Sequence, residues 1–241
     1  MVMLNFNKTF LRLILFLLIS LQNIAQESPN IIFLIGDGMG LTQISAGMYA
    51  NGNDTALADF DHIGLQKTNS ANSFVTDSAA SGTAMACGEK TLNKVIGINT
   101  KNIQLKSILE ICQEKGYKTA LLATSSIVHA TPASFYAKTT SRYKYEDIAW
   151  QLSKHSVDFF VGGGSDYFTN RGDKKNLIEE MDSYTFVKST EEYNNSNAPK
   201  IGFFTARKEP PPIYERRPFP LDQLTKITLS KLNSLKKPFF I

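Results

Sequence analysis

Short apolar runs alternate with stretches of helical spacing along most of this chain, and this alternation constrains the fold more than any other feature. The runs that read as strands are NIIFLIG (30–36), YKTALLAT (117–124), VDFFVGGG (157–164), IGFFTA (201–206) and KPFFI (237–241), with FDHIGLQKT (60–68) as a further plausible strand. Continuous apolar runs of this kind are typical of buried strands in a parallel sheet. Strands that alternate with helices require crossover connections, so we predict an α/β fold with a mostly parallel central sheet and helices on both faces.

The intervening segments carry helix signals. Thr76 or Asp77 can cap a helix that runs to Cys87, and Gly88 ends it. Further helices are predicted over 41–49, 103–116, 145–154 and 221–235. In open sheets of this type, ligands bind at the carboxyl ends of the strands, which directs attention to the loops that follow them.

The first residues have the layout of a secretory signal peptide. Lys8 and Arg12 precede the apolar run Leu13–Leu21, and small and polar residues follow up to an expected cleavage site after Ala25. The apolar run is shorter than the ~20 residues of a membrane-spanning helix. We therefore expect residues 1–25 to be removed, no membrane span after cleavage, and a periplasmic or extracellular location; an uncleaved membrane anchor is the alternative.

Composition supports a globular protein. The chain has 241 residues, of which 42% are hydrophobic and 20% charged, so residues 26–241 can form one large domain. The net charge of +4 comes without a basic stripe, and we expect no nucleic-acid binding. Two cysteines, Cys87 and Cys112, do not make a disulfide framework. Cys112 lies on an apolar helical pattern and is expected to be buried, while pairing of the two stays open.

The segment VTDSAASGTAMACG (75–88) places Asp77 and Ser78 side by side and then keeps to small side chains. One interpretation is a tightly packed helix with a capping aspartate. The other is a serine nucleophile at a helix N-terminus, where backbone N–H groups and the helix dipole favour an anion. A serine hydroxyl needs a base or a metal to become a nucleophile. The sequence shows no recognisable Ser-His-Asp arrangement, and no GxSxG elbow surrounds Ser78. Metal activation is the simpler option.

Four more residues can contribute to such a site. Asp37 lies between glycines at the end of the first strand, where its carboxylate can bind a divalent cation or cap the next turn. His129 and Thr131 follow another strand, and His129 can equally be an ordinary loop residue. Arg142 can clamp a phosphate with its guanidinium fork or simply lie on the surface. The other histidines are assigned no role, since His62 is expected to be structural and His155 exposed.

Several motifs together resemble one family. The segments NIIFLIGDGMG, VTDSAASGTAMACGEKT, HATPASF, TSRYKY and FFVGGG, in this order, resemble alkaline phosphatase from Pro29 to Ile241. The pair IGDGMG and TDSAAS at this separation is highly specific. The resemblance implies an enzyme that hydrolyses phosphate monoesters with two Zn²⁺ and one Mg²⁺ per complete active site, and a homodimer.

The resemblance also implies a role for each site residue. Ser78 would be the nucleophile that becomes a phosphoserine, Arg142 would grip the non-reacting phosphate oxygens, and Asp77 would position Arg142. For the metals, Asp37 would bridge one zinc and the magnesium site, with Ser78 as a zinc ligand and Thr131 as a magnesium-site ligand. His129 replaces an aspartate that some members carry in the outer shell of this metal site, which could alter the preference between magnesium and zinc.

The sequence departs from the family pattern in one respect. The family requires further aspartate, histidine and glutamate ligands, yet no histidine follows His155. We therefore expect residues 26–241 to be the N-terminal part of the catalytic domain, incomplete at its C-terminus, and to bind zinc poorly and hydrolyse little alone. The alternatives are a related phosphodiesterase-like or sulfatase-like hydrolase, although neither cysteine lies in a CxPxR-like motif, and a non-catalytic phosphate-binding protein.

Overall fold

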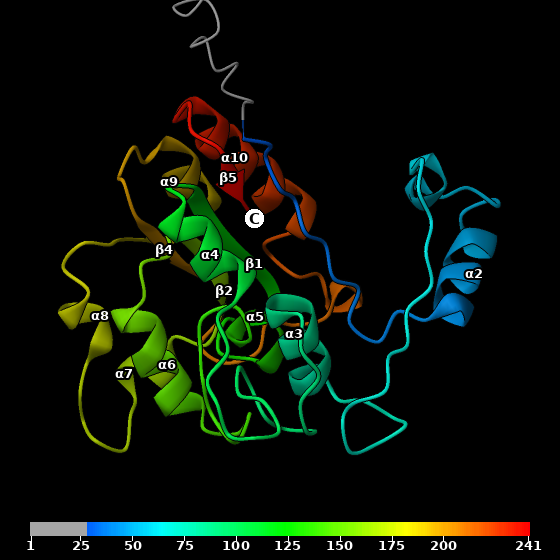
Figure 1. Cartoon of the computed structure of the whole chain (residues 1–241). Coiled ribbons are helices and arrows are strands. Elements are labelled where there is room, and N and C mark those ends of the chain that lie inside the picture. Colours follow the sequence, from blue (N-terminus) through cyan, green and yellow to red (C-terminus); the bar gives the residue numbers. More distant parts are fainter. Residues whose placement is uncertain (1–27) are drawn as a thin grey trace, which may run out of the picture.

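One parallel sheet forms the centre of the molecule (Figure 1). The computed structural model describes residues 28–241, so the predicted signal peptide lies outside the described residues. The strands are β1 (Lys118–Ser126), β2 (Phe159–Gly163), β3 (Thr185–Val187), β4 (Ile201–Phe204) and β5 (Phe239–Phe240). Their order is β3-β4-β2-β1-β5, and all four pairings are parallel. The predicted α/β class is confirmed, and β3 is a strand that the sequence did not indicate.

The helices connect the strands and cover the sheet. They are α2 (Leu41–Ala50), α3 (Ser78–Cys87), α4 (Ile108–Glu114), α5 (Ala130–Ala133), α6 (Tyr145–Lys154), α7 (Asp166–Thr169), α8 (Leu177–Glu180), α9 (Thr190–Asn195) and α10 (Leu221–Ser234), with 3-10 turns η1 (Ala56–Asp59) and η2 (Ile213–Glu215). The helix predicted from residue 103 begins only at Ile108, because Ser107 caps it and Glu110 completes a capping box. Within residues 28–241, no helix combines the length and apolarity that a bilayer crossing requires.

Successive strand residues point to opposite faces of the sheet and pack into two separate hydrophobic cores. Leu121 and Phe160 pack with residues of α3 to α8, whereas Ala120, Phe159 and Val161 pack with residues of α9 and α10. This period of two is what a strand buried on both faces requires. The predicted placement of helices on both faces is therefore confirmed.

The first predicted strand is only partly formed. Ile31 forms a parallel bridge with Phe240, and the N–H of Phe33 donates to the carbonyl of Ile241 at 2.8 Å. This segment therefore lies beside β5, but the prediction that it is buried was wrong, since Leu34 is 71% exposed. Among the described residues, no layer covers its outward side chains.

The strand predicted over 60–68 was also wrong. These residues belong to an N-terminal arm (residues 36–69) that includes α2 and η1 and projects away from the sheet (Figure 1). Within the described part of the chain, no neighbouring strand pairs with residues 60–68, and Leu65 is 92% exposed. An apolar run of β-type residues becomes a strand only where a partner strand supplies the hydrogen bonds.

The surroundings of His155 differ from the sequence prediction, whereas those of Cys112 agree with it. His155 is not exposed as expected: its side chain is 15% exposed, packs against the ring of Tyr136 and lies 3.8 Å from a Glu110 oxygen. Cys112 is buried, as predicted. Cys87 and Cys112 are both free thiols.

Candidate active site

Helix α3 begins where the sequence predicted. Asp77 is its N-cap in extended conformation, and the Asp77 carboxylate accepts a hydrogen bond of 3.0 Å from the N–H of Ala80. Ser78 is consequently the first helical residue, where unpaired N–H groups and the helix dipole face outward. At the other end, Gly88 has a φ of +72°, which favours glycine and ends the helix.

The small side chains of α3 allow it to pack against α5. A Cβ atom added at Gly82 would lie 2.7 Å from the Ser134 hydroxyl oxygen and 3.5 Å from the Cα of Thr131. Ala79, Ala80 and Ala86 are buried on the same helix. Because the two helices approach this closely, the start of α3 lies beside Thr131.

Asp37 connects the two helices at this point. One of its carboxylate oxygens accepts a hydrogen bond of 3.2 Å from the Ser78 hydroxyl, and the other accepts one of 2.9 Å from the Thr131 hydroxyl. Asp37 reaches this position from the loop after the first strand, in which Gly38 adopts a φ of +69°. Three segments that are far apart in the sequence therefore converge on one carboxylate.

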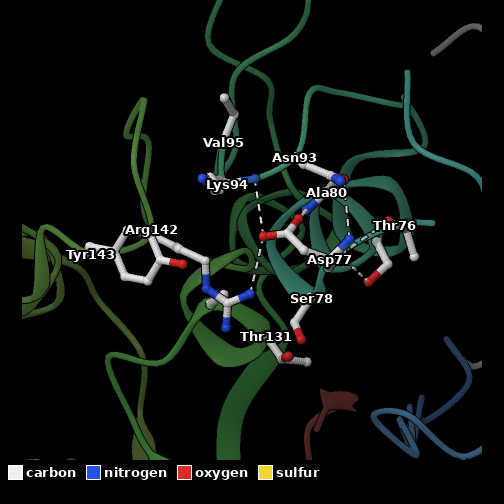
Figure 2. A network of polar contacts seen from close by, with 12 residues as sticks. Thr76, Asp77, Ser78, Ala80, Asn93, Lys94, Val95, Thr131, Arg142 and Tyr143 are labelled. Atoms are coloured by element: carbon white, nitrogen blue, oxygen red, sulfur yellow. Dashed lines mark hydrogen bonds and ion pairs between the residues drawn. The ribbon is translucent and has the colours of Figure 1, made fainter. Parts of the chain in front are cut away.

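Arg142 is held beside the start of α3 (Figure 2). Its Nη1 donates to a carboxylate oxygen of Asp77 at 3.1 Å, and its Nη2 lies 3.1 Å from Nε2 of His129. A guanidinium can only donate, so the contact requires His129 Nε2 to accept and Nδ1 to carry the proton. The guanidinium plane is thus fixed from two sides.

The pKa values of both partners agree with this arrangement. Burial acts to raise the pKa of Asp77, but it is lowered overall, because the N–H groups of Ala80 and Lys94 and the Arg142 guanidinium stabilise the carboxylate. The pKa of His129 is lowered by burial and by the charge of Arg142. Asp77 is therefore the anion of this group and His129 is neutral.

A cavity of about 710 Å³ opens over these residues. Asp37, Ser78, Thr131 and Arg142 line it, together with Lys67 from the arm and Lys90. The volume is within the usual range for small-molecule sites. Three cationic side chains and two carboxylates, those of Asp37 and Asp77, line the wall, so the balance of charge suits an anionic ligand.

The donor atoms at Asp37 suit a hard cation. One carboxylate and two hydroxyls are oxygen ligands of the kind that Mg²⁺ prefers and Zn²⁺ accepts. Among residues 28–241, no three His, Cys, Asp or Glu side chains converge in a metal-binding group. The donors around Asp37 therefore fit part of a coordination shell.

The structure adds three residues that the sequence did not indicate. Asn93 and Lys94 contact Asp77: the Asn93 Oδ1 accepts from the Asp77 N–H at 3.1 Å, and the Lys94 N–H donates to the Asp77 carboxylate at 3.0 Å. Glu209 accepts a hydrogen bond of 2.7 Å from the N–H of Ser126 and acts to raise the pKa of His129. All three lie in loops, where no periodicity marks a contact with distant residues.

Comparison with known proteins agrees with this geometry. The alkaline phosphatase family profile matches residues 28–241. The chain belongs to the alkaline phosphatase family. It is 36% identical over 233 residues to alkaline phosphatase 3 of Bacillus subtilis, covering 89% of this chain and 50% of that protein. It is 30% identical over 220 residues to the alkaline phosphatase of Escherichia coli, covering 74% of this chain and 47% of that protein.

Solved alkaline phosphatases share the fold. The enzyme of the Antarctic bacterium TAB5 superposes with a TM-score of 0.84 at 39% identity, covering 89% of this chain and 65% of that one. Variants of the TAB5 enzyme in which a histidine is replaced by glutamate or aspartate have Mg bound in the M3 site. The chain spans about half the length of the two curated relatives described above.

Proposed function

We propose that this chain carries the N-terminal part, residues 26–241, of the catalytic domain of an exported alkaline phosphatase. The substrate is a phosphate monoester, and the reaction proceeds through a phosphoserine on Ser78. One observation carries the proposal: the Ser78 hydroxyl lies at the N-terminus of α3, bonded to Asp37, in a cavity that Arg142 also lines.

The side chains have distinct roles in this reaction. The Ser78 oxygen attacks phosphorus, the ester P–O bond breaks, and the alcohol leaves with a proton. Asp37 orients the Ser78 hydroxyl through their hydrogen bond. Arg142, positioned by Asp77, neutralises the non-reacting phosphoryl oxygens together with the N–H groups at the start of α3. Water then cleaves the phosphoserine, which releases phosphate and restores the serine.

Asp37, Ser78 and Thr131 are the residues of this chain that would hold metal, in a site for two Zn²⁺ and one Mg²⁺. When bound, these ions lower the pKa of the serine hydroxyl and stabilise negative charge on the leaving oxygen. His129 would belong to the outer shell of the third metal site and tune its preference between magnesium and zinc. Its contact with the Arg142 guanidinium supports a place at the edge of the site.

Export and assembly are part of the same proposal. The layout of residues 1–25 supports a cleaved signal peptide and a periplasmic or extracellular enzyme. Family membership supports a homodimer.

The test is to trap the covalent intermediate. The protein is expressed from its full-length gene, incubated with radiolabelled inorganic phosphate, zinc and magnesium at acid pH, and quenched. We expect label on the peptide that contains Ser78, its loss in Ser78→Ala together with turnover of p-nitrophenyl phosphate, and normal labelling in the control Ser45→Ala. Ser45 is a matched control because it is a helical serine in the exposed arm.

Two outcomes would contradict the proposal. Saturable phosphate binding without covalent label would favour the non-catalytic binding protein. Faster cleavage of a phosphodiester or a sulfate ester than of the monoester would favour a related hydrolase.

A further inference from the structure

A two-residue turn, Asn93 and Lys94, contacts both halves of the phosphate-binding arrangement. We propose that this turn is a positioning element that sets the Ser78 nucleophile relative to Arg142. The inference rests on the proposed function and extends it to residues that do not line the cavity.

Asn93 holds the chain on the approach to Ser78. Its amide oxygen accepts from the Asp77 N–H at 3.1 Å, and its amide nitrogen donates to the Val75 carbonyl at 3.0 Å. The amide oxygen and the amide nitrogen of Asn93 therefore both bind backbone groups of the three residues that precede Ser78. Ser78 is covalently next to Asp77, so a shift of the Asp77 backbone moves Ser78 with it.

Lys94 acts through its backbone on the other half. Its N–H donates to the Asp77 carboxylate at 3.0 Å, and its carbonyl accepts from the Arg142 N–H at 2.8 Å. The same Asp77 oxygen also accepts from the Arg142 guanidinium. The backbone of one residue thus joins the helix cap and the arginine. Figure 2 shows the hydrogen bonds of Lys94 and Arg142 to the Asp77 carboxylate.

The turn is itself fixed in an unusual conformation. Lys94 has a φ of +73°, which residues with a Cβ atom rarely adopt. A second layer supports it, because Asn72 accepts from the Asn93 N–H at 2.9 Å and the buried Ser70 hydroxyl donates to Asn72 at 3.1 Å. A strained turn that its surroundings hold in place is the kind of feature that preorganises a site.

The experiment compares Asn93→Ala with Asn99→Ala in the enzyme expressed from its full-length gene. Asn99 is the matched control, since its side chain also makes two hydrogen bonds to the backbone, in a turn outside the network around Asp77: its amide oxygen accepts from the N–H groups of Lys101 and Ile103. We expect Asn93→Ala to lower kcat on p-nitrophenyl phosphate by about 10²-fold, the size of effect that a misplacement of about 1 Å produces. Asn99→Ala should leave kcat unchanged.

Two readouts separate positioning from stability. Inhibition by inorganic phosphate should weaken in Asn93→Ala, measured well below the melting temperature of each variant, and should not weaken further when Asn93→Ala is added to Arg142→Ala. Asn93→Asp keeps the acceptor for the Asp77 N–H and loses the donor to Val75. It should therefore retain more activity than Asn93→Ala, and it serves as the test if Asn93→Ala does not fold.

Different results would contradict this inference and the proposed function. Equal kcat in Asn93→Ala and Asn99→Ala, or an additive loss of phosphate inhibition on the Arg142→Ala background, would overturn the inference and leave the proposed function intact. A parent enzyme that forms no phosphoserine would overturn the proposed function and this inference with it.

Discussion

The N-terminal arm and the sheet-centred body differ in how they are held. Helix α2 of the arm has no buried residue, whereas the equally long α3 of the body has five. The arm exposes Tyr49 and Leu65, while the body buries Phe160 and Phe203 completely. Apolar burial is the main source of folding free energy, so the body supplies the stability of the described chain and the arm contributes little of it.

The candidate site draws on both regions. Ser78, Thr131 and Arg142 come from the body, and their positions follow from packing and from the contacts of Asp77. Asp37 comes from the base of the arm and joins the site through two hydrogen bonds. Stability and chemistry therefore depend on different parts of the chain, and this separation can be tested.

The largest effect is expected from truncating the core of the body. Phe160 is fully buried and packs against the rings of Tyr184, Phe186 and Phe204. Phe160→Ala should lower the free energy of unfolding by about 3–5 kcal/mol, because it leaves a cavity. Leu65→Ala in the arm should change it by less than about 0.5 kcal/mol. Urea denaturation of both variants is the measurement, and equal losses would refute the distinction between arm and body.

A substitution of Asp37, at the base of the arm, should lower activity without lowering the stability of the fold. Asp37→Asn removes the charge that both hydroxyls face, and we expect kcat to fall by about 10²–10³-fold together with a lower metal content. The melting temperature of the metal-free protein should stay unchanged, because Asp37 is exposed, whereas loss of metal by itself would lower that of the metal-loaded protein. Asp54→Asn, an exposed aspartate of the same arm, is the control and should behave like the parent. Enzyme assays, elemental analysis and thermal melts of the metal-free proteins decide the outcome, and a lower melting temperature of metal-free Asp37→Asn would show that the arm stabilises the fold.

The smallest effect on stability is expected from a charged group in the body, the Glu110 carboxylate. Glu110 caps α4, pairs with Lys138 at 2.8 Å and lies near His155. Burial acts to raise its pKa, but the contacts with His155, Lys138 and the Ser107 N–H lower it from 4.5 to about 2. A depressed pKa contributes stability that is present above about pH 4.5 and is lost as the pH falls towards 2.

Glu110→Gln should therefore cost about 1–2 kcal/mol at pH 7, the full shift being reduced by solvent screening at a half-buried site. The difference from the parent should shrink between pH 4.5 and 2. Glu114→Gln, which breaks a solvent-exposed pair with Lys106 on the same segment, should cost less than about 0.5 kcal/mol. A loss for Glu110→Gln that is independent of pH in a denaturation series would contradict the assigned ion contacts.

The sequence predicted the body better than the arm, for a physical reason. In the strands β1, β2 and β4, apolar pattern and tertiary burial agree, so the local signal was sufficient. In the arm, the same signal wrongly predicted a strand over 60–68, and just before the arm it wrongly predicted that the run 30–36 is buried. The apolar pattern of a segment indicates its local preference for a strand, whereas its burial depends on which other parts of the protein pack over it.

The candidate site could be predicted where motif and local structure coincide. The start of α3 at Asp77 and Ser78 was predicted correctly, because a capping aspartate indicates a helix start in the sequence itself. The contact of Arg142 with His129, and those of Asn93 with Asp77 and Val75, join residues that are 13 to 18 positions apart through loops. Loop geometry of this kind carries no periodic signal, so it emerges only from the three-dimensional structure.

The pairing of Ile31 with Phe240 has a consequence for biosynthesis. Asn30 and Phe239, which are also hydrogen-bonded, are 209 positions apart. At synthesis rates of about 5–20 residues per second, the first segment leaves the ribosome about 10–40 s before its partner exists. Throughout that interval, residues 30–36 lack β5, the strand beside which they lie in the described part of the chain. A chaperone or export factor that binds the nascent chain therefore meets this apolar segment unpaired.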